Sequence, residues 1–249
     1  MLLAARSPLA PPVDAATGTG HGGRARRWRV LAAYRTALYL HRRDAGVLAV
    51  VTSDGLALPT AWRLPIASAA VHWGVAAGDR VVTHGHEIRL PRRTIRAVRT
   101  WRPARVRVRE HPIDLHGPPL GWARERIGRG PGLTPEGDDE VCGALLVAYA
   151  AGDPRLALAT QPLLSRTSAL SASLLRAAAD GYAVPDLVTY VQARFDADVD
   201  LASQARAAVL TIGHTSGDAL VRGVDTTLDL LTPPLTSPLG PIVKETAHA

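Results

Sequence analysis

The sequence contains very few residues of several kinds. Its 249 residues include one cysteine, one methionine, one phenylalanine and one lysine, Lys244, and no asparagine. A single cysteine excludes an internal disulfide and is compatible with a reducing compartment. No run approaches the roughly 18 apolar residues of a membrane span, and the first five residues are too short an apolar core for a secretory signal. The sequence therefore predicts a cytoplasmic protein that does not enter the membrane.

Several motifs of known chemistry are also missing. Because the only lysine lies near the C-terminus, there is no phosphate-binding loop of the G-x-x-x-x-G-K-[ST] type. No cysteine-containing zinc spacing occurs, and we interpret His84-Gly85-His86 as a turn. No G-x-S-x-G serine motif is present. No helix-turn-helix, RNA-binding aromatic pair or zinc module accompanies the arginines, which argues against a nucleic-acid binder.

Charge is distributed unevenly along the chain. Residues 1–130 hold 22 arginines against 8 acids, a net charge of +14, whereas residues 131–249 have a net charge of −7, which together give the overall +7. Such asymmetry often marks separate domains. We expect a disordered leader over residues 1–26, a β-rich basic domain over 27–118 and a helical domain over 119–249. The arginine face of residues 105–109 is interpreted as a solvated face or a docking surface for an acidic partner.

The basic half has the pattern of short strands. Apolar runs at 29–32, 37–40 and 47–51 are separated by turn residues. Residues 80–83 and 87–90 flank His84-Gly85-His86 as a hairpin. Residues 105–109 alternate Arg and Val, which predicts a strand with arginines on one face and valines in a core. These features predict a small β-barrel or sandwich.

After residue 120 the apolar spacing changes to three and four residues, which predicts helices. The expected ranges are 135–151, 155–164, 167–180, 186–195, 200–211 and 217–231. The fold class is therefore α+β, with an N-terminal β-barrel or sandwich followed by a helical domain.

The sequence from Gly128 to Asp139, GRGPGLTPEGDD, joins a glycine loop to a helix. Glycines at alternate positions allow a sharply turning backbone. Thr134 is expected to cap the helix and Pro135 to be its first residue. Unpaired N–H groups and the helix dipole at such a start favour an anion. The alternative is an ordinary capped loop.

Asp138 and Asp139 would repel an anion unless a cation or a proton intervenes, which favours a functional site. Consecutive helix residues diverge by about 100°, so only one of them faces a ligand, and the pattern does not choose between them. The pair supplies too few ligands for most metals. A Mg²⁺ ion that keeps its waters is the one cofactor left open, and no protein metal site is predicted.

Two later stretches repeat small and hydroxyl residues. Thr167, Ser168 and Ser171 begin a helix, where they either bond back to the preceding turn or line a polar pocket. Gly213-His214-Thr215-Ser216-Gly217 precedes the last helix, and Thr215 or Ser216 is expected to cap it. His214 is either a packed or capping histidine or an acid–base group.

We interpret these stretches as one pocket at helix N-termini. The candidate catalytic residues are His214, Asp138 and Asp139. The candidate substrate- or anion-binding residues are Gly130, Gly132, Leu133, Thr134, Gly137, Thr167, Ser168, Ser171, Gly213, Thr215, Ser216 and Gly217.

The three motifs together resemble the AllH family, over roughly residues 28 to 231. The resemblance rests on G-x-G-P-G-L-T-P-x-G-D-D from Gly128, on residues 167–181 and on residues 213–217. It implies a subunit of an oxamate carbamoyltransferase complex of allantoin breakdown. Its substrates would be carbamoyl phosphate and oxamate or a similar small amide acid, and its partners the other subunits. The alternatives are a non-catalytic anion-sensing or assembly subunit and, less favoured, a nucleic-acid binder.

Overall fold

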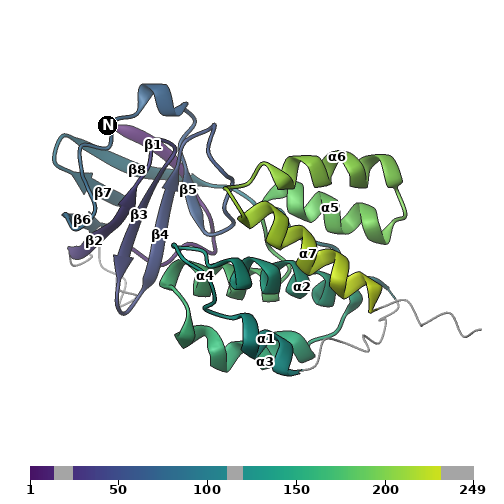
Figure 1. Ribbon diagram of the computed structural model, residues 1–249. Helices are drawn as coiled ribbons and strands as arrows, with labels where there is room; N and C mark the ends of the chain where they lie inside the picture. The colour runs from purple at the N-terminus through teal and green to yellow at the C-terminus, as the bar shows by residue number, and fades with distance from the viewer. Residues whose placement is uncertain (14–24, 111–119, 231–249) are drawn as a thin grey trace, which may run out of the picture.

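The computed structural model describes residues 1–13, 25–110 and 120–230. A closed β-barrel lies beside a group of helices, which confirms the α+β class (Figure 1). The strands are β1 (Leu2–Arg6), β2 (Arg26–Ala33), β3 (Ala37–Arg42), β4 (Gly46–Val51), β5 (Ala61–Arg63), β6 (Arg80–His84), β7 (Glu87–Leu90) and β8 (Arg93–Thr100), with a 3₁₀ turn η1 (Ser68–Ala70). The helices are α1 (Leu120–Arg126), α2 (Glu136–Ala151), α3 (Arg155–Thr160), η2 (Gln161–Arg166), α4 (Ala169–Ala179), α5 (Pro185–Phe195), α6 (Val199–Leu210) and α7 (Ser216–Asp229).

The barrel closes through its first strand. The strand order is β1-β5-β4-β3-β2-β6-β7-β8, and β1 pairs in parallel with β8. The expected disordered leader is therefore wrong for Leu2–Arg6. Ala4 is 2% exposed in the barrel core, and β1 covers what would otherwise be open edges of β5 and β8. Residues 14–24 of that expected leader lie outside the described residues.

The predicted strand runs and the hairpin are confirmed. Alternate residues of β2, β3 and β4 point into the barrel, where Trp28, Leu38 and Leu48 are almost fully buried. The indole Nε1 of Trp28 donates a hydrogen bond to Thr83 Oγ1 at 3.1 Å, so its polar group is satisfied inside the core. β6 and β7 pair around Gly85, whose φ of +58° suits glycine.

The alternating Arg105–Arg109 segment does not join the barrel. Its only strand-like pairing in the described residues is an isolated bridge between Arg105 and Tyr182. Val106 is buried in the helical core, whereas Val108 is 48% exposed. The guanidinium of Arg105 lies over the rings of Tyr149 and Tyr182. The prediction of a strand was wrong because the segment packs on the helical half instead of on a second strand. Arg105 stacks on Tyr149 of α2 and on Tyr182 of the loop after α4. The Val106 N–H donates to the Gly181 carbonyl oxygen.

All six predicted helices are confirmed within a few residues, with the second divided into α3 and η2. α2 is the central helix, and α4 and α7 pack against it (Figure 1). Gly223 of α7 lies so close to α2 that an added Cβ would be 1.9 Å from the carbonyl oxygen of Glu140. Gly143 of α2 makes the reciprocal approach to Leu220. No helix in the described ranges is both long and apolar enough to cross a membrane.

The barrel and the helices share a core. Leu48 and Val50 of β4 face the barrel interior, while Ala49 and Val51 face outwards and are buried by the helices. Side chains of both halves therefore pack together along part of the junction. This arrangement brings barrel loops next to the helix N-termini.

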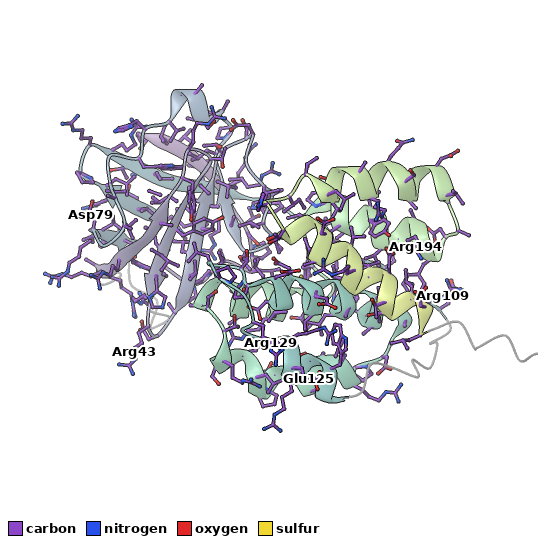
Figure 2. All side chains as sticks on the ribbon, in the orientation of Figure 1. Arg43, Asp79, Arg109, Glu125, Arg129 and Arg194 are labelled. Atoms are coloured by element: carbon purple, nitrogen blue, oxygen red, sulfur yellow. The ribbon has the colours of Figure 1, made fainter. Side chains whose placement is uncertain are left out.

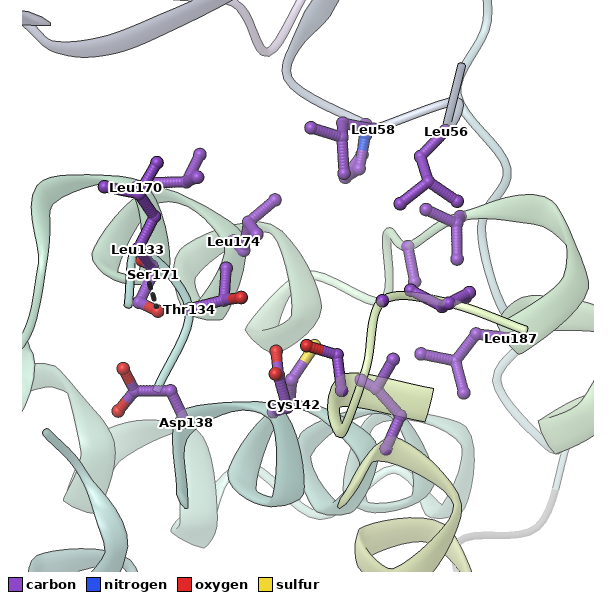
Figure 3. A pocket seen from close by; sticks show the side chains of 18 of the residues that line it. Leu56, Leu58, Leu133, Thr134, Asp138, Cys142, Leu170, Ser171, Leu174 and Leu187 are labelled. Atoms are coloured by element: carbon purple, nitrogen blue, oxygen red, sulfur yellow. Dashed lines mark hydrogen bonds between the residues drawn. The ribbon is translucent and has the colours of Figure 1, made fainter. Parts of the chain in front are cut away.

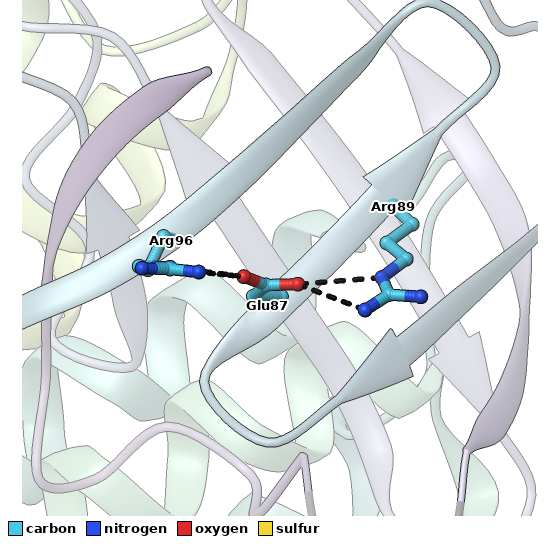
Figure 4. Close-up of polar contacts among 3 residues, drawn as sticks. All are labelled: Glu87, Arg89 and Arg96. Atoms are coloured by element: carbon cyan, nitrogen blue, oxygen red, sulfur yellow. Dashed lines mark hydrogen bonds and ion pairs between the residues drawn. The ribbon is translucent and has the colours of Figure 1, made fainter.

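The barrel surface carries part of the basic charge in ion pairs. Glu87 accepts hydrogen bonds from Arg96 at 2.9 Å and from Arg89 at 3.2 Å (Figure 4). The hydrogen bonds from Arg96 and then Arg89 hold the pKa of the Glu87 carboxyl below its usual range. The contact with Arg96 thus links β7 to β8.

Candidate active site at three helix N-termini

The glycine loop adopts the backbone that its composition predicts. Gly128, Gly130 and Gly132 have φ values of +83°, +114° and +92°, a region that other residues rarely adopt. The expected cap is wrong in position. Pro135 is the N-cap of α2 and no side chain caps that helix, so Thr134 is left outside it. A proline at the N-cap lacks the N–H that would need a partner, and Thr134 is released to face a cavity.

Hydroxyl groups of the α4 start hold this loop in place. Asp138 Oδ1 accepts a hydrogen bond from the Gly128 amide at 2.7 Å, and Oδ2 accepts one from Thr167 Oγ1. Ser168 Oγ caps α4 by accepting from the Ser171 amide and donates to the Leu133 carbonyl oxygen. Asp138 therefore acts as an anchor between the loop, α2 and α4.

A cavity of about 350 Å³ lies between the barrel and the helices (Figure 3). Its barrel wall consists of Tyr34, Tyr39, Leu56, Leu58 and Pro59. Its helical wall includes Leu133, Thr134, Asp138, Asp139, Cys142, Leu170, Ser171, Leu174, Leu175, Leu187, Ile212, Gly213, Ser216 and Leu220. The polar groups gather where α2, α4 and α7 begin, and the remainder of the wall is largely apolar.

The pKa of Asp139 in this wall is strongly raised. Its residue is 8% exposed, and its Oδ2 atom has no hydrogen-bond partner. Burial raises the pKa of its carboxyl to about 7, the charges of Asp138 and Glu136 act in the same direction, and the Ser216 hydroxyl opposes them. At neutral pH the group therefore exchanges a proton readily, which suits an acid–base residue.

Backbone donors lie around the same carboxyl. No hydrogen bond between described residues outside the regular helices and strands has the amide of Thr134 or Gly213 as its donor, and the amide of Ser216 lies in the first turn of α7, where the helix itself supplies no acceptor. Each belongs to a residue that lines the cavity near the start of α2 or α7, where the helix dipole favours negative charge. Burial raises the pKa of the neighbouring Cys142 thiol, so it is present as a neutral thiol.

The predicted site residues fall into two groups. Those that line the cavity are Asp138, Asp139, Leu133, Thr134, Ser171, Gly213 and Ser216. Those outside its lining are His214, Gly130, Gly132, Gly137, Thr167, Ser168, Thr215 and Gly217. The structure thus brings the two glycine loops to one cavity, and His214 is an exposed residue of the second loop.

Some of these residues have clear structural roles. A Cβ on Gly137 would lie 2.1 Å from the carbonyl oxygen of Arg126, and a Cβ on Gly217 would lie 2.4 Å from that of Val209. Both glycines therefore permit close approach of two chain segments. Thr215 is the N-cap of α7, but its side chain makes no capping bond.

The sequence motifs do not include the residues that the barrel contributes to the cavity lining. Tyr39, Leu56 and Leu58 are ordinary apolar residues in the sequence, and only the fold places them opposite α2. Burial, with a smaller effect of Tyr34, raises the pKa of Tyr39 to about 12. Within the described ranges, no three His, Cys, Asp or Glu residues form a group that would hold a metal ion.

Residues 126–228 match the family model described as Oxamate carbamoyltransferase subunit AllH. The matched region contains the glycine loop, α2 to α6 and nearly all of α7, and it leaves the barrel outside. No solved structure matches the chain.

Proposed function

We propose that this chain, which belongs to the AllH family through residues 126–228, binds the amide substrate of a carbamoyl transfer in the cavity beside Asp139. Membership of the family implies a subunit of an oxamate carbamoyltransferase. The observation that carries the proposal is Asp139, a buried residue of the cavity lining whose Oδ2 has no hydrogen-bond partner, together with the helix starts that contribute to the same lining.

The chemistry of the transfer fits these groups. The amide nitrogen of oxamate forms a bond to the carbonyl carbon of carbamoyl phosphate, the bond from that carbon to the phosphate oxygen breaks, and phosphate leaves. The attacking nitrogen must lose a proton. Asp139, whose pKa is about 7, is suited to take it. In the reverse direction the same carboxylic acid returns the proton to the departing amide nitrogen.

The backbone amides would serve the charge that develops. N–H groups of Thr134, Gly213 and Ser216 suit the carbonyl or carboxylate oxygens of a small amide acid, because preorganised donors stabilise negative charge at no reorganisation cost. Asp138, by contrast, is a positioning residue in this proposal. It fixes the loop through Gly128 and Thr167.

A second function is supported by a different observation. No arginine, lysine or histidine is among the described residues that line the cavity, and Arg129 lies exposed on the adjacent loop (Figure 2). Phosphoryl groups usually recruit cations. An accessory subunit that binds the amide acid or assembles the complex, while a partner handles carbamoyl phosphate, is therefore the competing proposal.

Replacement of Asp139 by Asn distinguishes the two functions. In the reconstituted complex, a proton-transfer role predicts that Asp139→Asn lowers kcat by roughly 10²–10⁴ and removes a pH dependence centred near 7. Asp186→Asn is the matched control, because Asp186 is an exposed acid in the first turn of α5. Full activity of the Asp139→Asn complex would leave only the accessory function.

A further inference from the structure

The apolar part of the cavity is larger than a small polar acid requires. Leu56 and Leu58 enter from the barrel. Leu170, Leu174 and Leu187 enter from the helices (Figure 3). Oxamate has no hydrocarbon group that would contact these side chains. Covering such a wall with apolar ligand atoms makes the free energy of binding more favourable.

The part of the polar end that Asp139 forms disfavours an ionised ligand group. The lining residues in the described ranges provide carboxyls from Asp138 and Asp139 but no cationic side chain. An ionised ligand carboxylate would meet the Asp139 charge whenever that group is deprotonated. A carboxamide is neutral: its NH₂ group can donate to the Asp139 carboxylate, and its carbonyl oxygen can accept from a helix-start amide. A primary amide satisfies both kinds of unpaired group.

We propose that the acceptor bound by this chain is a primary carboxamide with an aliphatic body of about four or five carbons. The amide contacts Asp139, and the aliphatic body lies between Leu56 of the barrel and the leucines of α4 and α5. This inference rests on the proposed function, in which the same cavity takes the amide substrate. The inference makes the barrel a determinant of specificity. The barrel lies outside the region that matches the family model, residues 126–228.

A homologous amide series tests the apolar body. Acetamide, propionamide, isobutyramide and isovaleramide are titrated into the full chain by calorimetry and thermal unfolding. Each added carbon is expected to strengthen binding roughly fourfold until the cavity is filled. A flat series, or oxamate binding more tightly than isovaleramide at pH 8, would overturn the inference.

A carboxylate partner tests the neutral head. Isovalerate is expected to bind at least about tenfold more weakly than isovaleramide at pH 8, because no described lining side chain is cationic. The gap should narrow at pH 5.5, where Asp139 is protonated and donates a hydrogen bond. In Asp139→Asn the affinity for isovalerate should no longer change between these pH values. Equal binding of the two ligands by the unaltered protein at pH 8 would contradict the neutral head.

Leu56→Ser tests the barrel wall without disturbing a core. Leu56 is 43% exposed, and Leu201, which is 41% exposed on α6, supplies the matched variant Leu201→Ser. Leu56→Ser should weaken isovaleramide several-fold and leave oxamate unchanged, whereas Leu201→Ser should affect neither. If oxamate binds and turns over through Asp139 while isovaleramide does not bind, the inference fails and the proposed function stands. If no compound binds and Asp139→Asn keeps full activity in the complex, both fail.

Discussion

Asp138 and Asp139 are neighbours in the chain, yet their carboxylates differ in their hydrogen-bond partners. Both oxygens of Asp138 accept hydrogen bonds, from Gly128 and Thr167, whereas Oδ2 of Asp139 has no partner. Both residues line the cavity, but the roughly 100° between consecutive helix residues separates their carboxyl groups, and only Asp138 reaches the loop. One acid therefore anchors the structure and the other is available to a ligand.

Asp139 should make stability depend on pH. Its folded pKa of about 7 lies above the 3.8 of an ordinary aspartate, so the native state binds more protons than the unfolded state between these values. Its contribution is fully present below about pH 4 and is lost as pH rises through 7. Asp139→Asn should therefore become more stable relative to the unaltered protein by about 1–4 kcal/mol as pH rises from 4 to 8.

Urea unfolding at several pH values measures this difference. Asp186→Asn is again the control, since an exposed acid should give a difference that barely changes with pH. A constant difference between Asp139→Asn and the unaltered protein over the whole range would refute the raised pKa.

The Asp138 anchor should behave as a coupled pair. Asp138→Ala leaves the Gly128 amide and the Thr167 hydroxyl without their acceptor, and Thr167→Ala removes one donor. We expect Asp138→Ala to cost about 2–4 kcal/mol and Thr167→Ala about 1–2 kcal/mol. In a double-mutant cycle the costs should be less than additive by at least about 0.5 kcal/mol. Simple additivity would show that the two side chains do not interact.

The contact between α2 and α7 should be intolerant of a single methyl group. Gly223→Ala would place its Cβ 1.9 Å from the Glu140 carbonyl oxygen, so the helices must separate. We expect a loss of about 2–4 kcal/mol, somewhat above ordinary overpacking because the obstacle is backbone. Gly121→Ala on α1 has open space around its Cβ and should change stability by less than about 1 kcal/mol. Equal effects of the two variants would contradict the close approach.

Much of the fold follows from local pattern. The helices from α2 to α7 have apolar residues at three- and four-residue spacing, and Gly152 stops α2 in the left-handed conformation that its position predicts. The strand runs and the turn at Gly85 are equally local. What local pattern does not contain is the partner of each element. β1 is recognised only through its pairing with β8, and Val106 only through the helical core.

The candidate site shows the same division. The glycine loops and the acids of α2 stand out in the sequence because their composition is unusual for a helix start. The different environments of Asp138 and Asp139 depend on α4 and α7, which lie about 30 and 80 residues further along the chain. Nothing in the sequence marks Leu56 and Leu58 as residues of the cavity lining, because apolar residues of this kind are equally expected in a hydrophobic core.

The boundary between the two halves is proposed to lie before Arg105. Val106 is 2% exposed among helical residues, whereas Val108 is 48% exposed. Val106→Ala should therefore destabilise the protein by about 1–3 kcal/mol, and Val108→Ala should have an effect below about 0.5 kcal/mol. Thermal unfolding of both full-length variants measures this. A larger loss of stability for Val108→Ala than for Val106→Ala would contradict the packing of Val106 in the helical core.

His214 offers a final test of how the cavity works. It is exposed and does not line the cavity, whereas its neighbours Ile212, Gly213 and Ser216 do. We expect His214→Gln to leave oxamate binding to the isolated chain unchanged and to lower turnover of the complex less than tenfold. A positioned acid–base histidine would instead cost roughly 10²–10⁴ in turnover with folding intact. That larger loss, with unchanged thermal stability and unchanged oxamate affinity, would mean that a partner subunit or a substrate brings His214 into the reaction. The proton transfer would then have to be reassigned from Asp139.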